Sequence, residues 1–195
     1  MTPFGGTGSM EDALKGKEIV LGVTGSIAAY KAVEIASRLV QQGAGVTVAM
    51  TRMGTRFVGP LSFQTLTHRR VLLDAPAGGD LPDPVHVTAA ERADLLVVAP
   101  ATANFLAKAA HGIADDVLTT LLLAVACPVL VAPAMNARMW ENAAVRENVR
   151  ILRERGVRFV DPEEGYLACG AVGRGRMADP ARLLAEIGKI LAAGR

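Results

Sequence analysis

Residues 129 to 140 read Val-Leu-Val-Ala-Pro-Ala-Met-Asn-Ala-Arg-Met-Trp. They begin as a β-branched and Leu run, which predicts a buried strand. Pro133 ends that strand because proline has no N–H to donate to a strand ladder. Asn136 comes where open α/β sheets bind their ligands, just beyond a strand's carboxyl end. Its amide can donate and accept together, although a simple helix cap is the alternative interpretation. The apolar walls predicted around it are Met135, Met139 and Trp140.

The first strand of the chain fits the same architecture, because Glu18 to Thr24 is the nearly continuous apolar run that buried parallel strands require. The next residues complete a predicted βαβ unit: a Gly25-Ser26 turn, a helix over Ile27 to Gln42 closed by Gly43, and a strand over Val46 to Met50.

The Gly25-Ser26 turn has the properties of a phosphate site. Backbone N–H groups, a hydroxyl and the positive end of the helix meet there. The full Gly-x-Gly-x-x-Gly pattern is absent and no acidic residue follows the second strand. The turn therefore favours a mononucleotide over a dinucleotide. A helix capped by Ser26, with no ligand, is the alternative.

The rest of the chain continues to alternate strands and helices. The segments predicted are short helices at Met53 to Val58 and Pro60 to His68, a loop at Ala75 to Pro84, a helix opening at His86, a strand at Leu95 to Ala99, a helix led by Asp115 and Asp116 through Ala124, a helix at Asn142 to Arg155, a strand at Val157 to Val160, a Gly-rich loop at Gly165 to Gly175, and a helix at Pro180 to Leu191.

This alternation predicts one domain of the Rossmann or flavodoxin-like kind, a doubly wound and mostly parallel sheet between helix layers. The Gly25-Ser26 turn, Pro100 to Asn104 and Pro133 to Asn136 all come after strands. Because parallel strands end at one edge, the three turns predict a single cleft.

Composition narrows the class of protein. The 195 residues are 51% hydrophobic, and their net charge of +2 gives no reason to expect nucleic acid or a membrane surface as partner. No apolar run reaches about 18 residues, the length of a membrane-spanning helix. The only cysteines, Cys127 and Cys169, do not suggest an extracellular disulfide framework. We expect a cytoplasmic protein, with Cys127 in the core.

The amino terminus differs from the rest. Met1 to Met10 is rich in Gly and Thr and lacks the charged and apolar regions of a signal peptide. We expect residues 1–16 to be a disordered tail or an appended remnant, and residues 17–195 to be the folded domain.

Four motifs together resemble one family. They are Gly25-Ser-Ile-Ala-Ala-Tyr-Lys31, Pro100-Ala-Thr-Ala-Asn104, Pro133-Ala-Met-Asn-Ala-Arg-Met-Trp140, and Ala168-Cys-Gly170 with Gly173-Arg-Gly-Arg-Met177. The chain resembles the flavin-dependent cysteine decarboxylases from about Lys17 to about Leu191, and most closely those acting on phosphopantothenoylcysteine in coenzyme A biosynthesis. Directly after two of these motifs, Phe105 stands where the family often has Thr, and Ala171 stands where many members carry Asp.

The resemblance implies FMN bound at the subunit contacts of a homotrimer, which is sometimes assembled further into a homododecamer. It implies no metal. The FMN contacts it implies are Gly25, Ser26, Ile27 and Thr51 along the phosphate and ribityl chain, and Pro100, Ala101, Thr102 and Asn104 beside the ring. The catalytic residues it implies are His86 for proton handling, Asn136 to hold the substrate's cysteine carboxylate, and Cys169 to protonate the intermediate, with Met139 in the substrate clamp.

The activity implied is decarboxylation of 4′-phosphopantothenoylcysteine to 4′-phosphopantetheine through thiol oxidation, CO₂ loss and re-reduction of the enethiol. A peptidyl-cysteine decarboxylase, which stops at the enethiol of a peptide's C-terminal cysteine, would share the FMN site, His86 and Asn136 but have less need of Cys169. A flavin-binding regulatory subunit without catalysis is a third class, but such relatives carry long acidic tails, unlike this sequence. Many bacterial versions continue into a second domain that forms phosphopantothenoylcysteine.

Overall fold

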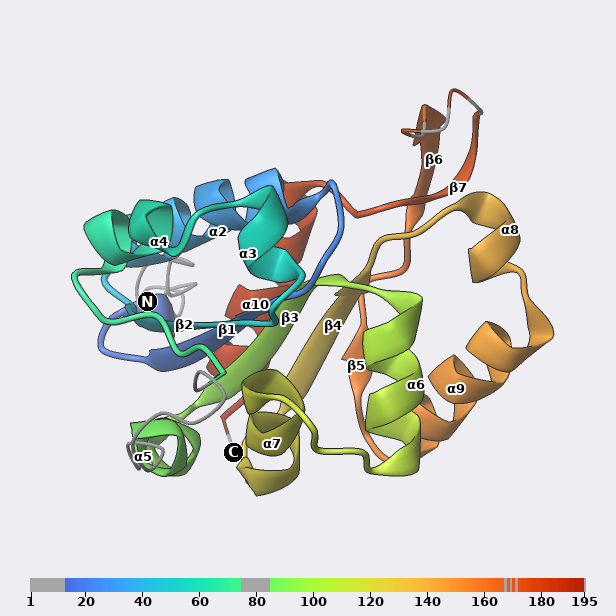
Figure 1. Ribbon diagram of the computed structural model, residues 1–195. Coiled ribbons are helices and arrows are strands. Elements are labelled where there is room, and N and C mark those ends of the chain that lie inside the picture. Colours follow the sequence, from blue (N-terminus) through green and yellow to red (C-terminus); the bar gives the residue numbers. More distant parts are fainter. Residues whose placement is uncertain (1–12, 75–84, 167, 169, 171, 195) are drawn as a thin grey trace, which may run out of the picture.

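A computed structural model describes residues 13–74, 85–166, 168, 170 and 172–194. At its centre lies a sheet of five parallel strands in the order β2-β1-β3-β4-β5 (Figure 1). The strands are β1 (Glu18–Val23), β2 (Gly45–Met50), β3 (Leu95–Ala101), β4 (Val129–Pro133) and β5 (Arg158–Phe159). The strand order reverses direction between β1 and β3, so the flavodoxin-like prediction is confirmed.

Helices cover both faces of this sheet. On one face pack α2 (Ala29–Gln41), α4 (Pro60–Thr67) and α10 (Pro180–Ala192), and on the other α5 (Val85–Arg92), α6 (Ala103–His111), α7 (Val117–Ala124) and α9 (Ala143–Glu154). Two short helices, α3 (Gly54–Phe57) and α8 (Ala137–Trp140), come after β2 and β4. No helix in the described ranges has both the length and the apolarity needed to cross a bilayer.

Burial explains why these segments take these forms. All seven residues of β3 are buried, as the continuous apolar run predicted. On α2, Ala32, Ile35 and Leu39 recur at helical spacing and are fully buried against the sheet. Gly43 lies just past that helix at a positive φ of 83°, which glycine adopts without steric cost.

Some boundaries differ from the prediction. The helix expected from Ile27 begins at Ala29, and Ser26 Oγ accepts a hydrogen bond from Ala28 N–H instead of capping the helix directly. Strand β3 continues through Pro100 and Ala101, where Ala101 O accepts from Ala134 N–H. The predicted tail was too long, because Leu14 is fully buried in the core. The predicted loop at residues 75–84 lies outside the described residues.

The largest correction concerns the predicted Gly-rich loop. Its two ends form an antiparallel hairpin of β6 (Glu163–Tyr166) and β7 (Val172–Arg176), which projects from the body above α8 (Figure 1). Neither strand has an alternating apolar pattern, so its sequence gives no strand signal. Pairing of the two backbones satisfies their hydrogen-bonding groups at the surface.

Candidate functional site

The carboxyl ends of the strands meet around one threonine. Thr24, which directly succeeds β1, is 1% exposed. Its hydroxyl donates to Pro100 O at 2.7 Å and accepts from Thr102 N–H at 3.1 Å. These two bonds join the ends of β1 and β3, so the Gly25-Ser26 turn and the residues after Ala101 are held side by side, as the single-cleft prediction requires.

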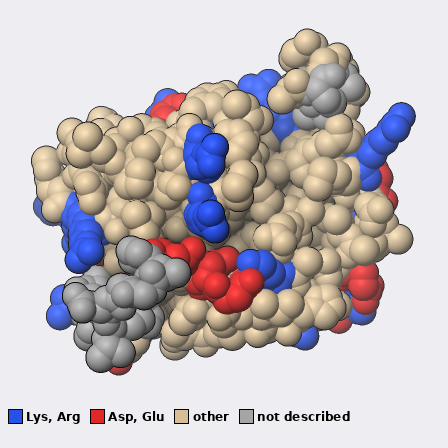
Figure 2. Space-filling model, in the orientation of Figure 1, with Lys and Arg blue, Asp and Glu red and all other residues tan. Residues whose placement is uncertain are grey.

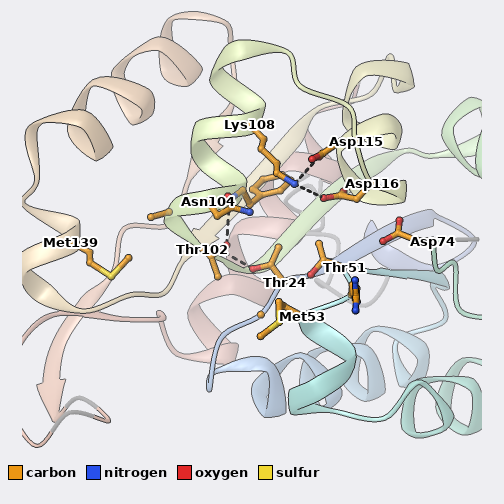
Figure 3. Close-up of a pocket in the computed structure, with 14 residues that line it drawn as sticks. Thr24, Thr51, Met53, Asp74, Thr102, Asn104, Lys108, Asp115, Asp116 and Met139 are labelled. Carbon is orange, nitrogen blue, oxygen red and sulfur yellow. Dashed lines mark hydrogen bonds and ion pairs between the residues drawn. The ribbon is translucent and has the colours of Figure 1, made fainter. Parts of the chain in front are cut away.

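Two adjoining cavities open at this edge and share Gly25, Thr102 and Met139. We call the first the polar lobe, about 520 Å³, and Figure 3 shows its lining. Its residues are Thr24, Gly25, Thr51, Arg52, Met53, Asp74, Thr102, Ala103, Asn104, Phe105, Lys108, Asp115, Asp116 and Met139. The volume lies within the range of small-molecule sites.

The turn at the entrance of the polar lobe is shaped for a close ligand. A Cβ on Gly25 would lie 2.4 Å from Met53 Cβ, so only glycine fits there. Neither Gly25 N–H nor Ile27 N–H has a hydrogen-bond acceptor within the described ranges. Thr51 Oγ1 sits nearby and accepts from Gly54 N–H at 3.2 Å. Exposed donors beside hydroxyls fit a phosphate and its ribityl chain.

An ion cluster closes the other end of the polar lobe (Figure 3). Lys108 Nζ donates to Asp115 at 2.6 Å and to Asp116 at 3.2 Å. The hydrogen bond to Asp115 raises the pKa of Lys108, and the second one, to Asp116, adds to it. Asp116 also caps α7 by accepting from Thr119 N–H, at the start of the helix that Asp115 and Asp116 were predicted to lead.

The second cavity, the apolar lobe, measures about 920 Å³. Its lining comes from the start of α2, from α3, from the turn after β4 and from the hairpin: Gly25, Ser26, Ile27, Ala28, Tyr30, Lys31, Phe57, Thr102, Ala134, Met135, Asn136, Met139, Tyr166, Ala168, Gly175, Arg176 and Met177. Most of these groups are apolar, with an amide and two cations among them.

Asn136 lies at the mouth of the apolar lobe and caps α8. Its Oδ1 accepts from Arg138 N–H at 2.8 Å. This bond engages the amide oxygen with the start of α8, so the cap interpretation is confirmed. Asn136 also lines the apolar lobe, so the cap does not conflict with the ligand interpretation.

Lys31 is a buried cation in the same lobe. Its side chain is 5% exposed, and Nζ donates to Met177 O at 3.0 Å. Burial lowers the pKa of Lys31, and the nearby Arg176 guanidinium lowers it further. The contact joins α2 to the end of the hairpin.

The structure brings most of the predicted site residues together. Gly25, Ser26, Ile27, Thr51, Thr102, Asn104, Asn136 and Met139 all line the two lobes. Pro100 and Ala101 are instead buried within β3 and line neither lobe. Trp140, predicted to form an apolar wall beside Asn136, is the last residue of α8, and its side chain is fully buried in the core. Cys127 is a core residue, as predicted.

Two predicted residues stay predictions. His86 stands in the first turn of α5, and its side chain is outside what the structure describes. Cys169 lies outside the described residues, and in the sequence it falls between β6 and β7.

Several lining residues were missed from the sequence. Thr24 was read as the end of a strand, although a polar residue closing an apolar run is a usable signal. Tyr30 and Phe57 were assigned to helices with no reason to expect exposure, yet they are 61% and 45% exposed. Tyr166 and Arg176 belong to the hairpin, which was not predicted, and Lys31 on α2 contacts the residue that follows it.

Comparisons with known proteins identify the family of this chain. The chain matches the model of the Flavoprotein family over residues 7–192. It is 48% identical over 171 residues to the coenzyme A biosynthesis bifunctional protein CoaBC of Bacillus subtilis (strain 168), which covers 88% of this chain and 42% of that protein. For CoaBC of Escherichia coli (strain K12) the identity is 44%, and the match covers 86% of this chain and 41% of that protein. The chain thus spans about two fifths of the length of these relatives.

Solved structures resemble it along almost their whole length. The FMN-dependent cysteine decarboxylase SpaF is 37% identical with a TM-score of 0.79, covering 92% of this chain and 98% of that one. A cysteine-to-serine variant of PPC decarboxylase, complexed with pantothenoylaminoethenethiol, is 30% identical with a TM-score of 0.81, covering 89% and 97%. With its fold and nearly all of its length matched, this chain belongs to the Flavoprotein family.

Proposed function

We propose that the protein is an FMN-dependent decarboxylase that converts 4′-phosphopantothenoylcysteine to 4′-phosphopantetheine in coenzyme A biosynthesis, and that it works in the cytoplasm. The observation that carries the proposal is the pair of lobes that share Gly25, Thr102 and Met139, one shaped for a cofactor and one holding Asn136. The similarity to CoaBC proteins and to PPC decarboxylase supports this substrate.

The polar lobe fits FMN. Gly25 and Thr51 of this lobe, with Ser26 and Ile27 of the adjoining apolar lobe, would hold the phosphate and ribityl chain, since they offer N–H and hydroxyl groups. Thr102 and Asn104, at the start of α6, would border the ring, above the buried Pro100 and Ala101. When bound, FMN supplies the chemistry that a β-thiol acid lacks, because it takes two electrons from the substrate thiol and returns them after CO₂ has left.

The cysteine end of the substrate would enter the apolar lobe. The Asn136 amide NH₂ donates to the carboxylate, and Met139 covers it from the shared rim. A mostly apolar wall removes water, and a carboxylate there loses CO₂ more readily because its charge passes to the less strongly hydrated sulfur of the enethiolate. We place His86 beside this reaction for proton handling near neutral pH. Cys169 would donate the proton when the enethiol is reduced.

A peptidyl-cysteine decarboxylase is the second candidate, and the 37% identity to SpaF favours it. Its peptide would place its C-terminal cysteine at Asn136 in the same way. The two functions differ in the last step, since only the coenzyme A enzyme reduces its enethiol.

We also propose that the protein assembles as a homotrimer, or as a dodecamer built from trimers, with FMN at the subunit contacts. Large apolar side chains are exposed around the lobes, at Ile27, Tyr30, Met53, Phe57 and Leu61. Over α2 and α4 most of the surface is uncharged (Figure 2). Such a surface is expected to be covered by another subunit.

The test is to incubate the purified protein with phosphopantothenoylcysteine and, separately, with a cysteine-ending peptide, and to follow the products by mass spectrometry. We expect a yellow protein that forms 4′-phosphopantetheine. The variant Cys169→Ser should release the enethiol, which has two hydrogens fewer, because a serine hydroxyl is a far weaker acid than a thiol. A colourless protein that takes up no FMN would refute the proposal, and enethiol from the unmodified protein with peptide alone would establish the second candidate.

A further inference from the structure

Strand β7 of the hairpin touches the Asn136 turn at one glycine. Gly175 O accepts a hydrogen bond from Met135 N–H at 3.0 Å. A Cβ on Gly175 would lie 2.2 Å from Met135 O, 3.1 Å from Ala137 N and 3.2 Å from Asn136 C. These atoms belong to the backbone on both sides of Asn136, so no side chain can turn aside to make room.

The conformation of Gly175 does not itself require glycine. Its φ is outside the positive range that L-residues avoid, whereas Gly170, near the tip of the same hairpin, has a φ of 84°. Any residue could adopt the Gly175 backbone. The missing Cβ therefore serves the close approach to the Asn136 turn.

The hairpin is tied to the body of the protein close to this contact. Gly175 is buried, and two residues on, Met177 is 1% exposed and its carbonyl accepts from the buried Lys31 Nζ. Met135, Asn136 and Ala137, on the other side, are partly buried. An atom added at Gly175 would therefore force the Asn136 turn and β7 apart.

We propose that Gly175 is a positioning residue for Asn136. Because Gly175 has no side chain, the Asn136 turn packs directly against β7, and this contact keeps the amide directed into the apolar lobe. The inference rests on the proposed function, because it explains how the carboxylate-binding amide is held. Under this proposal, the base of the hairpin at Gly175 takes part in substrate binding.

The experiment compares Gly175→Ala with Gly165→Ala, a control on the facing strand of the same hairpin. A Cβ at Gly165 would meet only the Arg176 side chain, at 3.1 Å, and that side chain can move. We expect Gly175→Ala to keep its FMN and melting temperature but to lose about 10²-fold in kcat/KM, the effect of misplacing a reacting group by about 1 Å. Gly165→Ala should match the unmodified protein.

Two further measurements separate positioning from a general structural role. In an Asn136→Ala background, Gly175→Ala should cost less than about twofold more, because both changes act through one amide. Trp140 is the only tryptophan, and its backbone N–H donates to Asn136 O at 3.0 Å. Its emission in the cofactor-free protein should therefore shift in Gly175→Ala and not in Gly165→Ala.

The outcomes distinguish the two hypotheses. An unmodified protein inactive on both substrates would refute the proposed function, and the Trp140 emission would still decide the positioning. An active protein in which Gly175→Ala behaves like Gly165→Ala would overturn the inference. A variant that loses FMN or melts much earlier, or whose loss is fully additive with Asn136→Ala, would show that Gly175 is a structural glycine and would overturn it too.

Discussion

At the scale of single residues, the site depends on side chains that do two tasks at once. The Thr24 hydroxyl joins the ends of β1 and β3 by two hydrogen bonds, and the same residue lines the polar lobe. Asn136 caps α8 with its oxygen, while its nitrogen is the donor that a carboxylate would need. A residue used in this way is held rigidly, because the structural bond restricts the rotamer that the binding group needs.

Replacing Asn136 by Asp tests the binding half alone. Aspartate is as good an N-cap as asparagine, so α8 should be retained. The amide donor becomes a negative charge facing the substrate carboxylate, which costs on the order of a few kcal/mol in a desolvated site. We expect FMN to stay bound and decarboxylation to be nearly abolished. Asn142→Asp, at the equivalent cap of α9, is the matched control. Near-normal turnover of Asn136→Asp would leave Asn136 with the cap role only.

A second residue-scale prediction concerns acid stability. Arg69 donates to Glu18 at 3.0 Å, and this hydrogen bond lowers the pKa of Glu18 below its usual 4.5. A carboxyl group with a lowered folded-state pKa stabilises the protein above its unfolded pKa, and that contribution is lost as the pH falls through the folded value. Arg69→Met should therefore be less stable at pH 7 but lose less on acidification. Urea unfolding at pH values from about 7 down to about 3 gives the free energy of unfolding of each protein as a function of pH. If the two proteins lose the same free energy of unfolding over this range, the prediction is wrong.

At the scale of elements, the sequence predicted every strand of the central sheet from its continuous apolar run, and most helices from apolar residues at helical spacing. It did not predict the hairpin. Glu163–Tyr166 and Val172–Arg176 are held by pairing with each other and by contacts to the Asn136 turn and Lys31, both distant in the sequence. The predicted cleft was correct as a place, but its second lobe needs the hairpin and could not be derived from the turns alone.

The cap of α10 gives an element-scale prediction. Asp179 Oδ1 accepts from Ala181 N–H at 2.9 Å, and Pro180 occupies the first turn. Asp179→Ala should destabilise the protein by about 1 kcal/mol, since one N–H at the helix start loses its acceptor. Asp179→Asn keeps the acceptor and should be nearly neutral. Thermal unfolding of the cofactor-free proteins measures the difference, and equal melting temperatures for both variants would show that the cap contributes nothing.

At the scale of the whole molecule, one sheet separates two helix layers, and the carboxyl edge of the sheet is left for ligands. Exposed large apolar side chains lie on or beside α2, α3 and α4, at Ile27, Tyr30, Met53, Phe57 and Leu61. The sequence predicted a doubly wound sheet but not the order of its strands, because the apolar residues of a buried strand do not specify which strand lies beside it.

The proposed assembly predicts a link between oligomerisation and the cofactor. Leu61, on α4, is 72% exposed and lines neither lobe. Leu61→Asp should dissociate the trimer and weaken FMN retention, because a charge would be buried at the contact. Light scattering and the flavin absorbance of gel-filtered protein measure both. Leu123→Asp, on α7 in the other helix layer, should leave the trimer intact. A stable Leu61→Asp monomer that keeps its FMN would contradict the link.

The contact between Lys31 and Met177 joins residues 146 positions apart, and this separation bears on how the protein is made. The polar lobe takes its lining from residues 24–139, but the apolar lobe also needs residues 166–177. Chains are synthesised from the amino terminus, and contacts between distant residues form late because closing a long loop costs entropy. Under the proposed function, a nascent chain therefore carries the residues that would contact FMN before the ribosome has released the hairpin. In that order of events FMN binds first, and the hairpin completes the proposed substrate lobe afterwards.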